Sequence, residues 1–221
     1  ECSAMATQEL GETIDLHGGG TDLIFPHHEC EIAQSEAITG KPFVKHWLHS
    51  AMVAYEGEKM SKSLGNSVYS SDLFAQAAAQ AVRYYLSSAH YRSVLDYQPA
   101  VLAEADAALG RILGFLERAQ RELAPTRFSD ADSSIAIPQE FATEMNDDFN
   151  VPAALAVVHD LVRSGNSDLD EQRLREAAQK RDQVNLMLEI LGLAPSQWQS
   201  QVSKEHQALD SLVQALIAER D

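Results

Sequence analysis

The stretch His17-Gly-Gly-Gly-Thr-Asp-Leu-Ile-Phe-Pro-His-His-Glu-Cys-Glu31 joins a run of glycines to side chains that bind metals. Glycine lacks a Cβ, so backbone N–H groups can close on a ligand, and we expect a turn at Gly18–Gly20. His27 and Glu31 are four residues apart, so a helix that starts at Pro26 places both on one face. An imidazole and a carboxylate on one face suit zinc. A flexible turn beside a solvated histidine pair is the alternative interpretation.

The residues around this stretch predict an open α/β sheet. Residues 13–16 read as a strand that leads into the glycines, and ligands bind beyond the carboxyl ends of such strands. The helix after Pro26 is expected to end at Gly40. A further strand is predicted over residues 51–55, with a turn at Glu56-Gly57 and a returning strand after it.

A second motif, Lys59-Met-Ser-Lys-Ser63, places two lysines and two serines in a short loop. Such a loop can contact phosphate oxygens through ammonium and hydroxyl groups. A solvated surface loop is the alternative for a lysine- and serine-rich pentapeptide.

Length and composition are typical of a soluble globular protein of one or two domains. The chain has 221 residues, of which 45% are hydrophobic and 23% are charged. No apolar run reaches membrane-spanning length, and no signal peptide is visible. The only cysteines, Cys2 and Cys30, do not make a disulfide framework and favour a cytoplasmic setting. The chain begins at Glu1 and ends within a helical pattern, so we expect a piece of a longer protein.

The net charge of −16 argues against a surface that binds nucleic acid generally. Residues 1–95 hold 11 acidic and 6 basic side chains, whereas the remainder holds 22 and 11. Six of the eight histidines lie in the first 90 residues. Chemistry is therefore expected in the first part of the chain, and the second part reads as a scaffold.

The second part is predicted to be an antiparallel helical bundle with apolar stripes at helical spacing. Asn150 is expected to cap a helix that ends near Val162, and a turn is expected over residues 164–168. The predicted helices cover residues 70–90, 99–125, 139–146, 150–162, 170–191 and 203–220.

Taken together, several motifs resemble the cysteinyl-tRNA synthetases, a family of class I aminoacyl-tRNA synthetases. The resemblance covers nearly the whole chain and is strongest over residues 1–93. The segments that carry it are Glu1-Cys-Ser-Ala-Met5, residues 17–29, Glu31-Ile-Ala-Gln-Ser-Glu36, Gly57-Glu-Lys-Met-Ser-Lys-Ser-Leu-Gly-Asn66, Ser88-Ala-His-Tyr-Arg-Ser93 and Met145-Asn-Asp-Asp-Phe-Asn150.

For the fold, the resemblance implies an α/β part followed by an all-α part. Residues 1–50 would be the carboxyl half of a Rossmann-type catalytic nucleotide-binding domain, and residues 51–95 a stem-contact segment that carries the lysine loop. Residues 96–221 would be a truncated helical bundle of the DALR type. The family's amino-terminal half and its extreme carboxyl end would lie outside this chain.

For the metal, the resemblance implies one Zn²⁺ ion held by Cys2, His27 and Glu31, with a fourth ligand, a cysteine, outside this chain. The thiolate of the substrate cysteine would join this ion. Because serine offers only a harder oxygen, a zinc site of this kind would select cysteine over serine without editing. Cys30 could intrude on the metal, although a spectator thiol is the interpretation that we prefer.

For the nucleotide, the resemblance implies that the glycine run, with Gly19 and Gly20, cradles ATP while Asp22 reaches the ribose hydroxyls. Lys59 and Lys62 would be catalytic, and Lys62 would contact the ATP phosphates as charge develops on pyrophosphate.

Three further positions are implied to line the substrates. His17 would form the floor of the cysteine pocket, and Met52 and Val53 would flank adenine through backbone atoms.

The implied reaction is the activation of L-cysteine by ATP, with Mg²⁺, to cysteinyl-adenylate, followed by transfer to the 3′ end of tRNA(Cys). A local basic patch of Lys59, Lys62, Arg83 and Arg92 would contact the tRNA despite the acidic net charge. The intact enzyme would be a cytoplasmic monomer without membrane partners, and we expect the present chain alone to be inactive.

Two alternatives stay open at this point. The cysteine ligase of mycothiol synthesis shares the zinc and lysine-loop motifs, but His17 and the segment Met145–Asn150 favour the synthetase. A non-catalytic zinc- or tRNA-binding fragment is the alternative from a different functional class.

Overall fold

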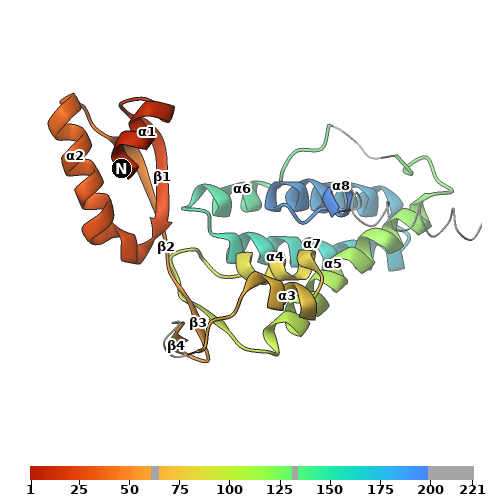
Figure 1. Ribbon diagram of the computed structural model, residues 1–221. Helices are drawn as coiled ribbons and strands as arrows, with labels where there is room; N and C mark the ends of the chain where they lie inside the picture. Colours follow the sequence, from red (N-terminus) through yellow and green to blue (C-terminus); the bar gives the residue numbers. More distant parts are fainter. Residues whose placement is uncertain (61–64, 131–133, 199–221) are drawn as a thin grey trace, which may run out of the picture. The chain divides into compact units, whose positions relative to one another are not determined.

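The computed structural model describes residues 1–60, 65–130 and 134–198 (Figure 1). It divides into two compact units, one made of residues 1–69 and 89–99 and the other of residues 70–88 and 100–221. Lys62 and the helix expected over residues 203–220 lie outside the described residues.

The described residues of the first unit form two helices, two small sheets and the turns between them. Its elements are α1 (Cys2–Leu10), β1 (Ile14–Gly20), a 3-10 turn (Thr21–Leu23), a wide turn (Ile24–His28), α2 (Glu29–Thr39), β2 (Val44–Ser50), β3 (Val53–Tyr55), β4 (Glu58–Lys59) and β5 (Leu95–Tyr97).

Strands β1 and β2 pair in parallel, and α2 forms the crossover between them. Parallel strands need such a crossover because the chain must return to the same end of the sheet. The register sets His17 opposite Trp47 and Gly19 opposite His49. Helix α1 packs on α2, and Phe43, which is fully buried, anchors the start of β2 in the core of this unit.

The glycine run does not form the turn that the sequence predicts. Gly18, Gly19 and Gly20 are the last three residues of β1 and pair with Leu48–Ser50 of β2. Their φ angles are not positive, since the positive-φ glycines of the described chain lie elsewhere. The glycines therefore serve close approach by neighbouring groups and not a left-handed turn.

Helix α2 also begins later than expected. Regular helix starts at Glu29 instead of Pro26, because Phe25 takes an extended conformation (φ −133°, ψ 132°) within the wide turn. The predicted end is confirmed, since Gly40 caps the helix in the left-handed conformation with φ 66°.

The second sheet of this unit has the strand order β4-β3-β5. Strands β3 and β4 form the hairpin expected around Glu56-Gly57, and both of these turn residues have positive φ angles. Strand β5 adds in parallel to β3. The backbone of Lys59 belongs to β4, while its side chain lies outside the described part of the chain.

The described residues of the second unit are helical apart from their connections. Its helices are α3 (Ser70–Gln76), α4 (Ala79–Ser87), α5 (Val101–Leu123), α6 (Gln139–Asn146), α7 (Val151–Asp170) and α8 (Leu174–Leu191). The division at residue 95 expected from the sequence differs from this one, because residues 70–88 group with the later helices. The reason is α4, which buries Val82, Tyr84 and Tyr85 and packs on α5.

Helix α7 is longer than the sequence predicts. Asn150 caps it by accepting a hydrogen bond from the Ala153 N–H, as expected, but the helix continues through residues 164–168 to Asp170. Asp170 therefore ends this helix and does not cap the next one. The turn-forming residues stay helical because Gly165 and Asp168 are buried against neighbouring helices.

The bundle is not wholly antiparallel, which corrects the expectation from the sequence. Arg118 of α5 contacts Asn166 and Asp170 of α7, while the earlier residue Arg111 shares a groove with His159. Later residues of α5 therefore contact later residues of α7. The two helices run parallel, as Figure 1 shows. Helix α8 follows α7 after only three residues and runs back along it.

The core of this unit lies where α5, α7 and α8 meet. Its fully buried side chains include Ile112, Phe115, Val158, Met187 and Leu188. Among the described helices, none is both long and apolar enough to cross a lipid bilayer.

Candidate metal site

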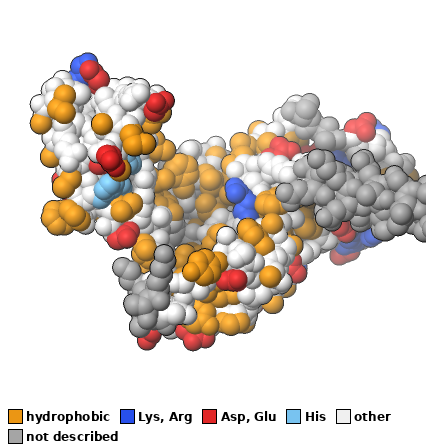
Figure 2. All heavy atoms as spheres, viewed as in Figure 1, with side chains coloured by type: hydrophobic (Ala, Val, Ile, Leu, Met, Phe, Trp, Pro, Cys, Tyr) orange, Lys and Arg blue, Asp and Glu red, His pale blue; other side chains and the backbone are white. Residues whose placement is uncertain are grey.

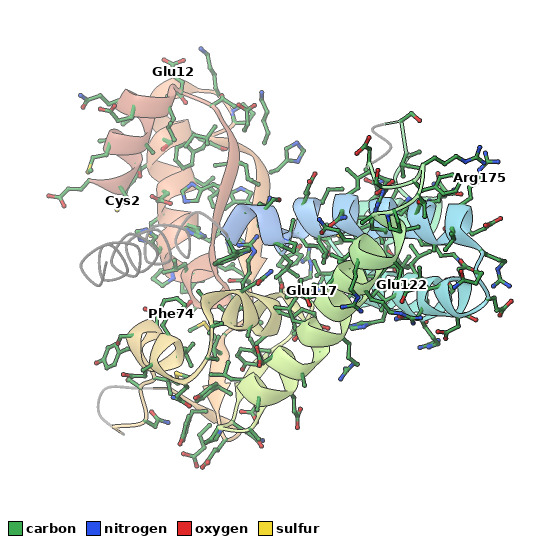
Figure 3. The ribbon with its side chains drawn as sticks, turned by 90° about the vertical axis from the view of Figure 1, so that its right-hand side faces the viewer. Cys2, Glu12, Phe74, Glu117, Glu122 and Arg175 are labelled. Carbon is green, nitrogen blue, oxygen red and sulfur yellow. The ribbon has the colours of Figure 1, made fainter. Side chains whose placement is uncertain are left out.

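Three residues from separate parts of the first unit converge at the start of α2. Cys2 begins α1 (labelled in Figure 3), His27 lies in the wide turn, and Glu31 lies in the first turn of α2. One ligand atom from each, Sγ, an imidazole nitrogen and a carboxylate oxygen, lies within 4.8 Å of the others. The fold thus brings together the three residues that the sequence resemblance selects.

Glu31 is the buried member of this set. It is only 4% exposed, although carboxylates are seldom buried without a partner. Its Oε1 lies 3.8 Å from His27 Nε2, and its Oε2 lies 3.4 Å from His17 Nε2. Oε2 is fully buried and makes no hydrogen bond within the described chain. A carboxylate held in this way is expected to face a cation.

These donors fit zinc in both chemistry and spacing. Zinc takes thiolate, imidazole and carboxylate ligands at about 2.0–2.3 Å, so adjacent ligand atoms of a tetrahedral ion lie about 3.3–3.8 Å apart. The separation of 3.8 Å between His27 Nε2 and Glu31 Oε1 is close to that range. The set leaves one position of a tetrahedral ion open.

A second set of donors shares Glu31 with the first. His17, His28 and Glu31 also offer ligand atoms within 4.8 Å of one another. His28 is buried and its Nδ1 lies 2.8 Å from His49 Nε2, so one of its ring nitrogens already has a partner. Burial lowers the pKa of His28, and the neighbouring His17 and His49 lower it further. His28 is therefore neutral at pH 7.

No role was assigned from the sequence to His28, Trp47 or His49, whose rings lie together with that of His17. Trp47 stacks on His17 with ring centroids 4.8 Å apart and lies 5.7 Å from His49, with the two rings nearly parallel. Trp47 and His49 are two residues apart on β2 and so point to the same face as each other. The sequence signal for this cluster is the spacing of Trp47 and His49, two residues apart, together with His17 directly after the strand predicted over residues 13–16.

Part of the histidine cluster reaches solvent. The side chain of His27 is 45% exposed and that of His17 is 21% exposed. Figure 2 shows pale-blue histidine atoms gathered at one place on the surface of the first unit. Cys30, the second residue of α2, is also exposed.

Gly19 and Gly20, which lie beside the histidine cluster, leave space for the side chains of neighbouring residues. A Cβ at Gly19 would lie 2.9 Å from Cε1 of His28, and a Cβ at Gly20 would lie 2.5 Å from Oδ1 of Asp22. Met52 Sδ would lie 3.5 Å from the same Gly20 Cβ. The fold thus gathers Gly19, Gly20, Asp22 and Met52, whose roles toward a nucleotide remain predictions.

Two members of the expected basic patch have described side chains, one in each unit. Arg83 donates Nε–H to the Leu191 carbonyl at 2.9 Å, so it caps the end of α8 within the second unit. Arg92 lies over the Tyr91 ring, 5.1 Å from its centroid, in the first unit. The other two members, the side chains of Lys59 and Lys62, lie outside the described part of the chain.

Two family models match the chain. The model of the class I (C) tRNA synthetase catalytic domain matches residues 1–107, and that of the DALR domain matches residues 140–195.

Relatives similar along the whole chain are cysteine–tRNA ligases. The protein from Clavibacter michiganensis subsp. michiganensis is 52% identical over 228 residues, which span 100% of this chain and 47% of that protein. The protein from Leifsonia xyli subsp. xyli is 52% identical over 223 residues, with 100% and 46% covered. That from Micrococcus luteus is 47% identical over 222 residues, with the same coverage. The chain spans just under half the length of these relatives.

Solved structures share the fold at low sequence identity. The LeuRS of Agrobacterium radiobacter K84, solved with tRNA and LeuAMS, superposes with a TM-score of 0.65 at 17% identity, over 79% of this chain and 25% of that one. The Mycobacterium tuberculosis methionyl-tRNA synthetase, solved with methionyl-adenylate, gives a TM-score of 0.55 at 18% identity, over 81% and 40%.

Proposed function

Because the chain belongs to the cysteine–tRNA ligase family of class I tRNA synthetases, we propose that it supplies the amino-acid-selecting part of an enzyme that charges tRNA(Cys). The substrates would be L-cysteine, ATP with Mg²⁺, and tRNA(Cys). A cytoplasmic location and a monomeric state of the intact enzyme are parts of the same proposal.

The observation that carries this proposal is the convergence of Cys2, His27 and Glu31. These residues would hold one Zn²⁺ ion, with a further protein ligand from outside residues 1–221. A bound zinc ion supplies a soft Lewis acid that favours a thiolate over a hydroxyl.

The chain's own residues would position the substrate beside this site. Buried Glu31 places a negative charge between His17 and His27, which keeps both imidazoles turned toward the centre of the cluster. Trp47 and His49 hold His17 and His28 in fixed orientations by ring contact and by the His28–His49 hydrogen bond. His17 would form the floor of a small pocket that excludes side chains larger than that of cysteine.

The nucleotide would bind at the end of β1. Gly19 and Gly20 leave the backbone bare there, and Asp22 follows in the next turn, where its carboxylate would reach ribose hydroxyls. Lys59 and Lys62 would neutralise charge on the ATP phosphates during adenylate formation. Catalysis of this kind depends on positioning and charge stabilisation more than on proton transfer.

Metal-dependent binding of cysteine tests the proposal. We expect isothermal titration calorimetry to show that the zinc-loaded chain binds L-cysteine at least about tenfold more tightly than L-serine. The preference should disappear after chelation and in His27→Ala. The exposed His46→Ala, on β2, is the matched control and should keep it. Equal binding of cysteine with and without metal would contradict the proposal.

A further inference from the structure

A groove between α5 and α7 carries side chains that the proposed catalytic function does not use. It has a volume of about 530 Å³ and is lined by Arg111, Gly114, Phe115, His159, Val162, Arg163 and Asn166. We call it the α5/α7 groove. All of its lining residues belong to the second unit, far along the sequence from the candidate metal site.

The polar lining of the α5/α7 groove consists of cationic and neutral groups. Two arginines, a histidine and an asparagine face it, and no carboxylate is among its lining residues. This is unexpected in a chain with a net charge of −16. A local excess of positive charge on an otherwise acidic protein attracts an anion to that one site and not to the surface as a whole.

The two arginines are available to a ligand. Arg111 has no carboxylate within ion-pair distance among the described residues, and Arg163 pairs only with Asp160 at 3.0 Å, where both side chains are more than two-thirds exposed. An exposed pair of this kind is weak and readily exchanged. Arg118, two turns after Arg111, differs because it is already neutralised by Glu122 and Asp170.

The histidine of the groove, His159, is held by a hydrogen bond and lies close to the positive charge of Arg111. His159 Nε2 lies 2.9 Å from the hydroxyl of buried Tyr84, which holds the ring at the groove wall. Burial lowers the pKa of His159, and the nearby Arg111 lowers it further. The imidazole is therefore neutral at pH 7, and the charge of the groove comes from its arginines.

The shape of the groove suits a backbone phosphate. Gly114 has open space where a Cβ would stand, so the side of α5 is unobstructed, while buried Phe115 forms a firm floor. Arginine forks bind phosphate oxygens in pairs, and two of them on facing helices can hold one phosphodiester from both sides. RNA presents such groups at its surface in a continuous row.

We propose that the α5/α7 groove binds a phosphate of the tRNA backbone through Arg111 and Arg163, and so helps to orient the tRNA on the helical unit. This inference rests on the proposed tRNA substrate. A free phosphate offers the same chemistry, and the experiment below separates the two sources.

The test measures binding of unfractionated tRNA to the 221-residue chain by fluorescence anisotropy over a range of salt concentrations. We expect the Arg111→Gln/Arg163→Gln double variant to lower the slope of log K against log salt by about 1, because the two arginines together hold one phosphate, and either single variant to lower it by less. The double variant should bind tRNA about tenfold more weakly.

Arg175→Gln is the matched control. Arg175 is exposed on α8 (labelled in Figure 3), lies outside the α5/α7 groove, and loses the same charge on substitution. We expect it to leave affinity and salt slope unchanged. All three arginines are exposed, so thermal unfolding of the variants should match the wild type and exclude misfolding as a cause.

Two outcomes would overturn the inference. One is equal tRNA binding by Arg175→Gln and the Arg111→Gln/Arg163→Gln double variant. The other is unchanged tRNA binding by the double variant together with lost binding of inorganic phosphate, which would assign the groove to a small anion. Zinc-dependent cysteine binding, measured on the same variants, reports separately on the proposed function and should be unaffected.

Discussion

At the scale of single residues, Glu31 determines what the candidate metal site can do. Its carboxylate is buried between His17 and His27, and one of its oxygens lacks a hydrogen bond within the described chain. Burying a charged oxygen that accepts no hydrogen bond destabilises the folded state. A bound cation would offset that cost, so stability and metal binding are expected to oppose each other at this position.

Glu31→Gln tests whether the stability of the metal-free protein and its affinity for metal oppose each other. The amide removes the buried charge, so we expect the metal-free variant to be about 1 kcal/mol more stable than the wild type, while its zinc affinity falls. Chemical unfolding in the presence of a chelator measures the first effect, and zinc titration measures the second. Glu29→Gln, an exposed neighbour on α2, should change neither. A metal-free Glu31→Gln variant that is less stable than the wild type would contradict the account.

The sequence predicts which of the candidate ligands face each other better than it predicts their surroundings. The spacing of His27 and Glu31 predicts that they face each other, and their nitrogen and oxygen atoms do lie 3.8 Å apart. The positions of Cys2 and the imidazole cluster depend on contacts between distant elements, which local spacing does not encode. Gly19 was expected in a turn, yet it lies in β1, where it pairs with His49 of β2 and leaves space for the ring of His28.

At the scale of elements, the contact between α5 and α7 shapes the helical unit. Gly165 of α7 lies against the ring of Phe115, where an added Cβ would stand 2.5 Å from Cζ. The ring is buried and cannot move aside without disturbing its neighbours. The glycine therefore permits a close helix approach, although in an isolated helix it lowers helical propensity.

Gly165→Ala and Gly114→Ala separate these two effects. We expect Gly165→Ala to lower the free energy of unfolding by about 2 kcal/mol, because the methyl group overpacks the core. Gly114 lies on α5 with open space at its Cβ position, so Gly114→Ala should raise stability by up to about 1 kcal/mol. Urea unfolding measures both. Equal effects of the two substitutions would show that propensity, not packing, governs Gly165.

The end of α7 is held by a buried ion cluster. Asp168 is 2% exposed and contacts the guanidinium of Arg173 and the ammonium of Lys180. Burial alone would raise the pKa of Asp168, but the hydrogen bonds from Lys180 and Arg173 outweigh it and lower the pKa below its usual value. The cluster explains why residues 164–168, which favour a turn by composition, remain helical.

Asp168→Asn should reveal this cluster through its pH dependence. A lowered pKa in the folded state stabilises the protein above the unfolded value of about 4, and that contribution is lost as the pH falls through the folded pKa. We expect Asp168→Asn to destabilise the fold by about 3 kcal/mol at pH 7, with the difference shrinking below pH of about 4. The exposed Asp170→Asn should have a much smaller effect. A difference independent of pH would contradict an ionic role.

At the scale of the whole molecule, the sequence predicts most elements but not how they connect in space. Gly40 and Gly192 end their helices as expected, and α6 has the predicted bounds. The parallel course of α5 and α7 was not predicted, because short loops between helices favour antiparallel neighbours. Here, α6 lies between α5 and α7 in the sequence, and α7 runs in the direction of α5.

The candidate metal ligands and the largest helical core lie in different units. The described metal-ligand candidates lie in residues 1–31 of the first unit, and the largest buried apolar core lies among the helices of the second. The α5/α7 groove adds a cationic site to the unit that composition marks as scaffold. The net charge of the chain does not indicate this groove, because the groove forms only where the fold brings Arg111 of α5 and Arg163 of α7 together.

The central claim is that Cys2, His27 and Glu31 form one metal site, and cobalt(II) titration tests it most directly. A thiolate ligand gives cobalt a charge-transfer absorption band, so the spectrum reports whether Cys2 binds the ion. We predict the band in the wild type and in Cys30→Ser, whose substituted thiol is exposed on the same unit, and its absence in Cys2→Ser. A band that persists in Cys2→Ser, or that disappears in Cys30→Ser, would contradict the account.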